Sequence, residues 1–405
     1  MNLEESKGII ELDDLNLKCV IFKIRNNNIE ILATSSIPSE GIHNDVIVNL
    51  SKASNAIRSC ISSAEKKAKI SLKKINVVLE QPDFLCTKFS KHKKINGSKI
   101  YKDDIDFLLK EAKKQLLYND KTQSIIHIFN YNYIVDGKSF IEEPINVYAD
   151  SLTHQMTFIT APKNNLKNIN QAFIDCDIEV ERLFSRTFAQ GVKLLEEKEL
   201  HFGSVLLNLD FEKTSLGLFK NLALVHSTTF PFGINHITKD ISKVCSLSLS
   251  ESENIRNNIN FLLQENQTIF DENDYLKNSY FVKSNFRKIN KNLILNVIQA
   301  RLNEMINTLR KELIIPELNI NHGASFYFSG IGSNLLNIDK YFIKLLRFDI
   351  NNSKKNNIDK DKNFVPCLGA AKIIAEGWET EAIPESTSKN EEKVSLFTKI
   401  FGMYK

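Results

Sequence analysis

The sequence predicts an α/β protein with two related lobes, because a module of three short strands followed by helices occurs twice along the chain. The first copy begins near residue 8 and the second near residue 204. A chain of 405 residues is also too long for one simple core and suits several subdomains. A cleft between two such lobes is a common place for a ligand.

The first module consists of β-rich runs that are separated by polar breaks. They cover residues 8–13, 18–24 and 29–34, with three asparagines in the turn before the last run. Residues 50–69 place apolar side chains at helical spacing, and residues 75–80 have the composition of a buried strand. An antiparallel meander followed by a helix and a further strand is the order of a ribonuclease-H-like unit.

Residues 85–160 have a sequence pattern that differs from that of the preceding residues, and this pattern predicts a small inserted α/β subdomain. A basic loop at 91–99 leads to a helix at about 102–117, and strand-like runs follow at 124–135 and 154–160. We expect the basic loop to be a solvated turn.

The second module repeats the first in outline. Its three strands are expected at 204–209, 215–219 and 222–227, its long helices at about 236–264 and 290–313, and a buried strand at 325–329. Residues 379–392 are polar and lack periodicity, which predicts a flexible linker.

Composition and charge exclude several classes of function. The net charge of +4 is small, and basic residues alternate with acidic ones, so we expect no nucleic-acid binding. The six cysteines form no C-x-x-C pair, so a zinc site is not expected. The N-terminus lacks the pattern of a signal peptide, and no run of about 18 apolar residues occurs, so we expect a cytoplasmic protein with at most peripheral membrane contact.

The segment 393–405 has an amphipathic pattern. With about 100° per residue, one half of a helical wheel is apolar, and Lys399 and Lys405 lie on the other half. The apolar half holds Val394, Leu396, Phe397, Ile400, Phe401, Met403 and Tyr404. About 12 helical residues span roughly 18 Å, which suits a helix lying in a membrane interface. A helix that packs on its own domain would show the same periodicity.

Eight segments in one order resemble the motifs of FtsA, the bacterial actin relative of the division ring. They are 12–19, 36–48, Ala64-Glu65, 133–137 (YIVDG), 231–241 (PFGINHITKDI), 252–256, 300–304 (ARLNE) and 328–332 (FSGIG). The resemblance implies an actin-like, duplicated ribonuclease-H-like fold with an inserted subdomain of the 1C type. The implied parts are 1–84 and 161–203 for the first lobe, 85–160 for the inserted subdomain, 204–378 for the second lobe, 379–392 for the linker and 393–405 for a membrane-targeting helix.

The resemblance also implies an ATP site with magnesium, built on two glycine-rich turns. The residues at the matching positions are Asp13, Asn16, Lys18, Lys213, Thr214, Gly233, Glu253, Arg256, Gly330, Gly332 and Ser333. The turns depart from the family, because Leu15 replaces a glycine in the first, and Asp210, Phe211 and Glu212 replace glycines in the second. Bulk and negative charge there oppose a polyphosphate. Either a weakened ATP site or a cleft filled by side chains fits this pattern, and no residue stands out as a catalytic base.

The partners implied by the resemblance are the C-terminal tail of FtsZ, further copies of this chain in filaments, later division proteins and a membrane surface. Arg287 and Arg301 are the candidates for gripping the acidic FtsZ tail, although ordinary surface arginines look the same. The implied location is the cytoplasmic face of the bacterial inner membrane at the septum. Alternative interpretations are the actin-like PilM protein of type IV pilus assembly, or an ATPase of the same superfamily.

Overall fold

The computed structural model describes residues 6–25, 28–258, 274–313, 324–335, 338–346, 353–355 and 363–382. The chain divides into two compact units. Unit 1 consists of Met1–Gly203, Gly217–Thr228 and Asp359–Lys405, and unit 2 consists of Ser204–Leu216 and Thr229–Ile358. The segment 393–405, for which a membrane-targeting helix is expected, lies outside the described residues. Among the described helices, none combines the length and the apolar content that crossing a bilayer requires.

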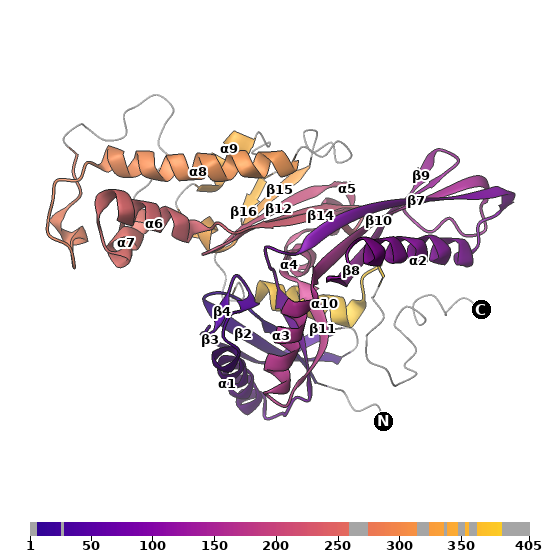
Figure 1. The fold of residues 1–405 in the computed structure, drawn as a ribbon, viewed down its shortest axis with the longest axis horizontal. Helices are drawn as coiled ribbons and strands as arrows, with labels where there is room; N and C mark the ends of the chain where they lie inside the picture. Colours follow the sequence, from indigo (N-terminus) through magenta and orange to yellow (C-terminus); the bar gives the residue numbers. More distant parts are fainter. Residues whose placement is uncertain are drawn as a thin grey trace. The chain divides into compact units, whose positions relative to one another are not determined.

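The central sheet of unit 1 has the strand order β11-β6-β1-β2-β3 (Figure 1). The strands are β1 (Lys7–Glu11), β2 (Asn16–Arg25), β3 (Asn28–Pro38), β6 (Lys74–Leu79) and β11 (Glu179–Ser185). The first three form an antiparallel meander, whereas β6 is parallel to β1 and β11 is parallel to β6. This mixture confirms the ribonuclease-H-like unit that the sequence predicts.

Side-chain capping and backbone conformation explain where the first helix of unit 1 begins and ends. α1 (Leu50–Ala68) begins after Asn49, whose side chain accepts a hydrogen bond from the backbone N–H of Lys52, and ends at Lys69 in the left-handed region. The other helices of the unit are α3 (Lys163–Ile174), α4 (Arg186–Leu194), α5 (Glu197–Phe202) and α10 (Val365–Glu376). The short strands β4 (Ile42–His43) and β5 (Val46–Ile47) form a separate hairpin.

α10 packs against α4 and so belongs to unit 1. This differs from the expected second lobe of 204–378, which included α10. A Cβ atom on Gly369 would lie 1.8 Å from the carbonyl oxygen of Ala189, so only glycine permits the close approach of the two helices. The sequence contains that glycine but does not reveal which helix it meets.

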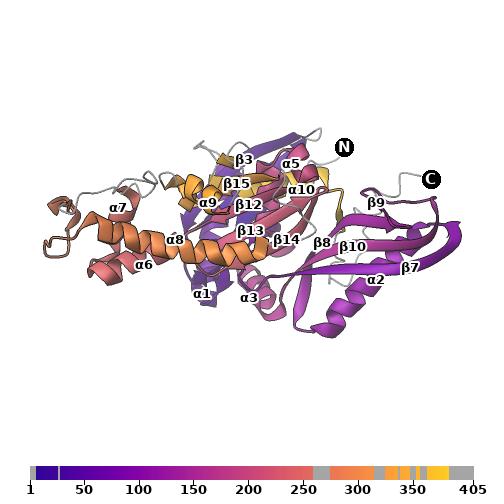
Figure 2. The same cartoon turned by 90° about the horizontal axis from the view of Figure 1, so that it is seen from above.

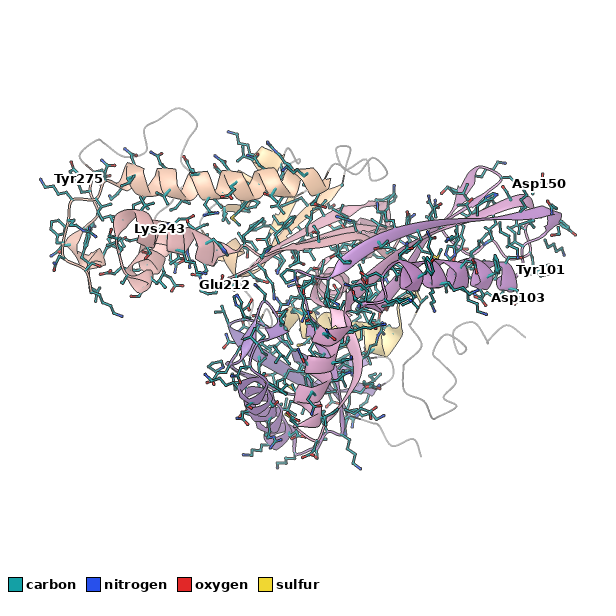
Figure 3. All side chains as sticks on the ribbon, in the orientation of Figure 1. Tyr101, Asp103, Asp150, Glu212, Lys243 and Tyr275 are labelled. Carbon is teal, nitrogen blue, oxygen red and sulfur yellow. The ribbon has the colours of Figure 1, made fainter. Side chains whose placement is uncertain are left out.

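The inserted subdomain is a sheet of order β17-β8-β10-β7 with α2 along one face (Figure 2). Its elements are β7 (Leu85–Lys99), α2 (Lys102–Asn119), β8 (Gln123–Val135), β9 (Lys138–Phe140) and β10 (Tyr148–Pro162). The start of α2, at Tyr101 and Asp103, lies at the same end as Asp150 (Figure 3). The expected solvated turn at 91–99 is wrong, because these residues continue β7 and pair with β10. On this edge strand Lys94 is exposed, whereas Lys91, Lys93 and Lys99 are half-buried, and Lys93 pairs with Asp104 of α2 at 2.6 Å.

The expected flexible linker at 379–392 is wrong at its beginning. Glu381 and Ala382 form β17, which pairs antiparallel with Phe129 and Ile128 of β8. Ala382 is buried in the core of the inserted subdomain together with Leu116, Met156 and other side chains. Residues 383–392 lie outside the described part of the chain.

The sheet of the second module has the order β14-β13-β12-β15-β16. Its strands are β12 (Ser204–Leu209), β13 (Thr214–Lys220), β14 (Ala223–Phe230), β15 (Ser325–Ser329) and β16 (Ser353–Lys355), and parts of β13 and β14 belong to unit 1. The helices are α6 (Ile234–Cys245), α7 (Leu249–Asn258), α8 (Lys291–Leu313) and α9 (Ile338–Leu346). The single helix expected at 236–264 is wrong, because Ser246 adopts a left-handed conformation that ends α6.

Candidate functional site

The first candidate turn joins β1 to β2 and carries Asp13 and Asp14. Together with Asp45, from the turn between β4 and β5, they place carboxylate oxygens within 4.8 Å of one another. Asp45 is fully buried, and its carboxylate accepts a hydrogen bond of 2.7 Å from the backbone N–H of Glu80. Three carboxylates this close repel one another unless a cation lies among them.

Arg186 supplies that positive charge. Its guanidinium is 1% exposed and donates to the carbonyl oxygen of Leu12 at 2.8 Å, to Asp45 at 3.1 Å and to Asp13 at 3.3 Å. Its Nε lies 3.1 Å from a carboxylate oxygen of Glu11. Arg186 holds this place because it is the first residue of α4, where Ser185 caps the helix.

Lys18 adds a second cation on the other side of the same turn. Its ammonium lies 3.3 Å from Glu11 and 3.7 Å from Asp13. Asn16 begins β2 opposite Pro38, and Leu15 stands half-exposed where the resemblance expects glycine. Arg186 and Lys18 therefore offset part of the negative charge of Glu11, Asp13, Asp14 and Asp45, and the guanidinium beside Asp13 and Asp45 opposes the binding of a further cation there.

The second candidate turn joins β12 to β13 in unit 2. The N–H of Asp210 donates to the carbonyl of Lys213 at 2.9 Å, which closes the turn. Glu212 lies at the turn end of these strands (Figure 3), where it accepts 2.6 Å and 3.2 Å contacts from Asn235 and Lys239. The hydroxyl of Thr214 donates to the carbonyl of Phe232 at 2.7 Å. The polar groups at this turn, which could otherwise bind a phosphate, are thus already hydrogen-bonded within this chain.

Glycines near this turn approach the protein's own backbone. A Cβ atom on Gly233 would lie 2.4 Å from the carbonyl oxygens of Asp210 and Phe211, and one on Gly330 would lie 2.4 Å from that of Leu209. Gly332 packs against the Leu209 side chain, and the Ser333 hydroxyl donates to the Gly330 carbonyl at 2.6 Å. These glycines, at positions that match an ATP site, thus closely approach Leu209 and the β12–β13 turn of this chain.

Glu253 and Arg256 lie one turn apart on α7, as the sequence predicts, and form an ion pair at 3.2 Å. The Arg256 side chain is buried and donates to Thr238 at 2.6 Å and to the carbonyl of Ile234 at 3.2 Å. Arg256 thereby joins α7 to α6, a role for which its spacing from Glu253 gives no signal.

Arg287 and Arg301, the candidates for holding an acidic peptide, bond to this chain. Arg301 forms an ion pair with Asp240 at 2.5 Å and with Glu304 at 2.6 Å. Arg287 precedes α8 and donates to the carbonyl oxygens of Cys245 and Ser246 at 2.7 and 2.8 Å, at the end of α6. Both therefore make the contacts of structural surface arginines.

A buried polar network at β17 was not foreseen from the sequence. The Glu381 carboxylate binds Arg182 and lies 2.5 Å from Nδ1 of His127, whose Nε2 accepts a hydrogen bond of 2.9 Å from the N–H of Ser185. Burial alone raises the pKa of Glu381, but Arg182 and His127 outweigh it and lower that pKa to about 2. The partners are far apart in the sequence, so no local pattern announces the network.

Arg186 was also missed. The available signal is an arginine at the first position of α4, directly after a capping serine. A charged residue that will be fully buried requires acidic partners, and Glu11, Asp13 and Asp45 are the ones in reach.

Known proteins resemble this chain in sequence. The SHS2 domain inserted in FTSA matches residues 85–160, the inserted subdomain. The chain is 25% identical to the cell division protein FtsA of Buchnera aphidicola subsp. Schizaphis graminum over 309 residues, which are 76% of this chain and 72% of that protein. It is 26% identical to the cell division protein FtsA of Streptococcus pneumoniae over 256 residues, 62% of this chain and 54% of that protein.

Solved structures show the same fold. The PilM-PilN type IV pilus biogenesis complex superposes with a TM-score of 0.62 at 13% identity, over 93% of this chain and 99% of that chain. MreB 5 of Spiroplasma citri bound to AMPPNP superposes with a TM-score of 0.53 at 13% identity, over 91% of this chain and 96% of that chain. Fold and inserted subdomain together define an actin-like protein.

Within that class, the chain resembles bacterial FtsA, and its residues 85–160 match the SHS2 domain inserted in FtsA. The fold class and the resemblance expected from the sequence are confirmed.

Proposed function

We propose that this protein is a scaffold of bacterial cell division that tethers FtsZ filaments to the cytoplasmic membrane. The observation that carries the proposal is the match of residues 85–160 to the SHS2 domain of FtsA within an actin-like chain. The proposal includes actin-like polymerisation and the recruitment of later division proteins at the septum. Its membrane contact is the segment 393–405, whose apolar half and two lysines suit an anionic membrane interface.

The nucleotide has a minor role in this proposal. MreB 5, with a similar fold, is seen bound to AMPPNP. In this chain, Arg186 and Lys18 already bind acids of the first turn, and Asp210 and Glu212 bring negative charge to the second. We therefore propose that MgATP binds weakly and that hydrolysis is not the main activity.

An actin-like pilus-assembly protein remains the second candidate, because the PilM-PilN complex shares the fold over 93% of this chain. The identity of 13% supports the fold alone. The match of residues 85–160 favours the division scaffold, since the matched family is the SHS2 domain inserted in FtsA.

A vesicle-bridging assay tests the proposal directly. Vesicles of phosphatidylethanolamine and phosphatidylglycerol in a ratio of about three to one are sedimented with the full chain and a fluorescent peptide of the FtsZ C-terminal tail. We expect the peptide to sediment only when the chain is present. A matched variant that lacks 392–405 should bind the peptide in solution but leave it in the supernatant.

Two results would refute the tether. Equal sedimentation of the full chain and of the variant without 392–405 would show that this segment is no anchor. Absence of peptide binding by both proteins would favour the pilus-type candidate over the division scaffold.

A further inference from the structure

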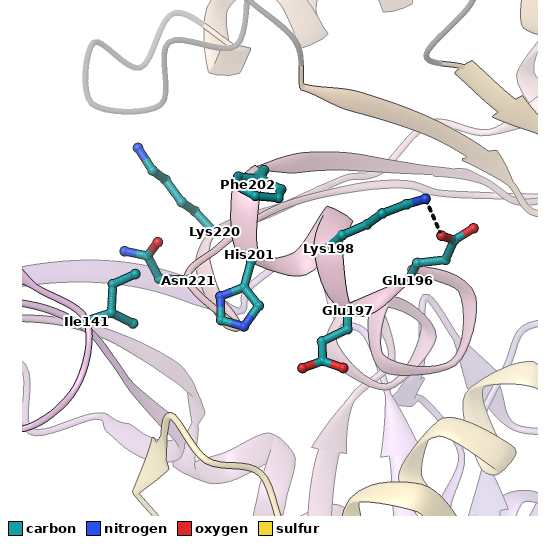
Figure 4. A pocket seen from close by; sticks show the side chains of 8 residues that line it. All are labelled: Ile141, Glu196, Glu197, Lys198, His201, Phe202, Lys220 and Asn221. Atoms are coloured by element: carbon teal, nitrogen blue, oxygen red, sulfur yellow. Dashed lines mark ion pairs between the residues drawn. The ribbon is translucent and has the colours of Figure 1, made fainter.

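A pocket of about 710 Å³ lies in unit 1 beside α5, and we refer to it as the α5 pocket (Figure 4). It is lined by Ile141, Glu196, Glu197, Lys198, His201, Phe202, Lys220 and Asn221. Its size falls in the range of about 300–1,000 Å³ that is usual for binding pockets. The pocket belongs to neither candidate turn, and the proposed function does not use it.

Two apolar side chains of the α5 pocket are exposed to solvent. Phe202 is 84% exposed at the end of α5, and Ile141 is 47% exposed beyond β9. An aromatic ring left in water beside a hollow marks a surface that another apolar segment can cover. The feature therefore indicates an apolar occupant that inserts next to Phe202.

The lining of the α5 pocket carries two acids, Glu196 and Glu197, and two lysines, Lys198 and Lys220, so its formal charge is zero. Lys198 is paired with Glu196 at 2.9 Å, whereas Glu197 forms no ion pair within the described residues. Glu142, which follows the pocket residue Ile141 in sequence, is exposed and likewise forms none among them. An occupant with apolar side chains and lysines would complement both the ring and these carboxylates.

Residues 378–380 lie near one edge of this pocket, and β17 then runs along β8 away from Tyr131. Trp378 and Thr380 donate to the carbonyl of Leu222 at 2.6 and 2.9 Å. The preceding residue, Asn221, lines the pocket and donates to the carbonyl of Tyr131 on β8 at 2.9 Å. The last described residue, Ala382, pairs with Ile128, three positions from Tyr131 on the same strand.

Chain length permits the return to the pocket. Three strand residues cover about 10 Å. The 11 residues from 383 to 393 span at most about 40 Å, and a flexible chain of that length has a root-mean-square extent of about 17–20 Å. The segment 394–405 therefore reaches the α5 pocket at an effective concentration on the order of millimolar.

We propose that the segment 394–405 docks in the α5 pocket of its own chain when no membrane is present. Its apolar residues cover Phe202 and Ile141, and Lys399 meets Glu197. The proposal rests on the proposed membrane anchor, because the same apolar half that docks on Phe202 is the half that enters a lipid interface. Docking and membrane binding then exclude each other, so the pocket keeps the anchor covered until lipid competes for it.

The expected magnitude follows from this competition. Apparent affinity for vesicles falls by the fraction of molecules whose anchor is free. If about 80% of molecules are docked, opening the pocket raises that affinity about five-fold.

The test compares full-length proteins on vesicles of phosphatidylethanolamine and phosphatidylglycerol. Phe202→Ala should bind the vesicles several-fold more tightly than wild type. Tyr118→Ala is the matched control, because Tyr118 is 82% exposed on α2 and does not line the pocket. It should bind as wild type does. A carbodiimide cross-link between Lys399 and Glu197, located by mass spectrometry, should form within one chain and be lost when vesicles are added.

The outcomes separate the two proposals. Equal vesicle affinity of wild type and Phe202→Ala, without the cross-link, overturns the docking while loss of binding on deleting 392–405 still supports the anchor. A cross-link that joins two chains also overturns docking within one chain. Unchanged vesicle binding after the deletion overturns the anchor and, with it, the docking.

Discussion

Replacement of Arg186 by alanine should destabilise unit 1 strongly. The guanidinium contacts Leu12, Asp13 and Asp45 at 2.8 to 3.3 Å and lies 3.1 Å from Glu11, in a position that is 1% exposed. Without it, buried carboxylates remain uncompensated, and removing one partner of such a network costs about 3–5 kcal/mol. At about 2–4 °C per kcal/mol for a domain of this size, the melting midpoint should fall by about 6–20 °C.

Tryptophan fluorescence gives a direct reading of this change. Trp378 is the only tryptophan of the chain, belongs to unit 1 and stacks edge-on against Phe188, two residues from Arg186. Arg25→Ala is a suitable control, since its ion pair with Glu30 is exposed and contributes about 0–1 kcal/mol.

A magnesium ion can replace the positive charge that the Arg186→Ala substitution removes, and its effect on the melting midpoint can be measured. In Arg186→Ala, the oxygens of Asp13, Asp14 and Asp45 lie within 4.8 Å of one another without their internal cation. About 10 mM magnesium chloride should therefore raise the melting midpoint of the variant more than that of wild type. A midpoint for Arg186→Ala within about 2 °C of wild type would refute the reasoning.

The remaining predictions concern acid sensitivity and nucleotide. Burial against Tyr133 lowers the pKa of His154 to about 3. Between pH 6.5 and pH 3 the unfolded chain therefore binds a proton at this histidine that the folded chain does not bind. Stability should therefore fall by about 2 kcal/mol from pH 7.5 to pH 5, and urea melts of His154→Phe should lack this loss; an equal loss in the variant would contradict it. Calorimetry with MgATP should give a dissociation constant weaker than micromolar, and submicromolar binding would count against the charge argument at the two turns.

Much of the fold could be predicted because its strands and helices carry strong periodicity. The meander, α1, α2, α8 and β15 appear where apolar spacing indicates them. The elements that the sequence predicted wrongly have physical explanations. Residues 91–99 are lysine-rich, yet an edge strand tolerates lysine because one face and one edge remain in water. Glu381 looks like linker sequence, but its backbone pairs with Phe129 and its side chain contacts His127 and Arg182, all of them distant in the sequence.

The contacts of the candidate site could not be predicted from the sequence. Leu15 and the acids at 210 and 212 predict turns that differ from a glycine-rich phosphate cradle, and the weak nucleotide site that follows from them stays a prediction. Sequence spacing cannot reveal that Arg186, some 170 residues after Asp13, donates a hydrogen bond to Asp13 at the first turn. Nor can it reveal that Gly330 meets the backbone of Leu209. Both contacts depend on strand order, which brings remote residues together.

β17 also determines how mechanical force enters the molecule. Tension along this strand, applied beyond Ala382, shears its ladder with β8 rather than opening the hydrogen bonds one at a time. Glu381 contacts His127, and His127 accepts a hydrogen bond from the N–H of Ser185, the cap of α4, so these contacts form a path along which such tension would be transmitted. A pull on the C-terminal chain therefore reaches the residue next to Arg186 through two buried side chains.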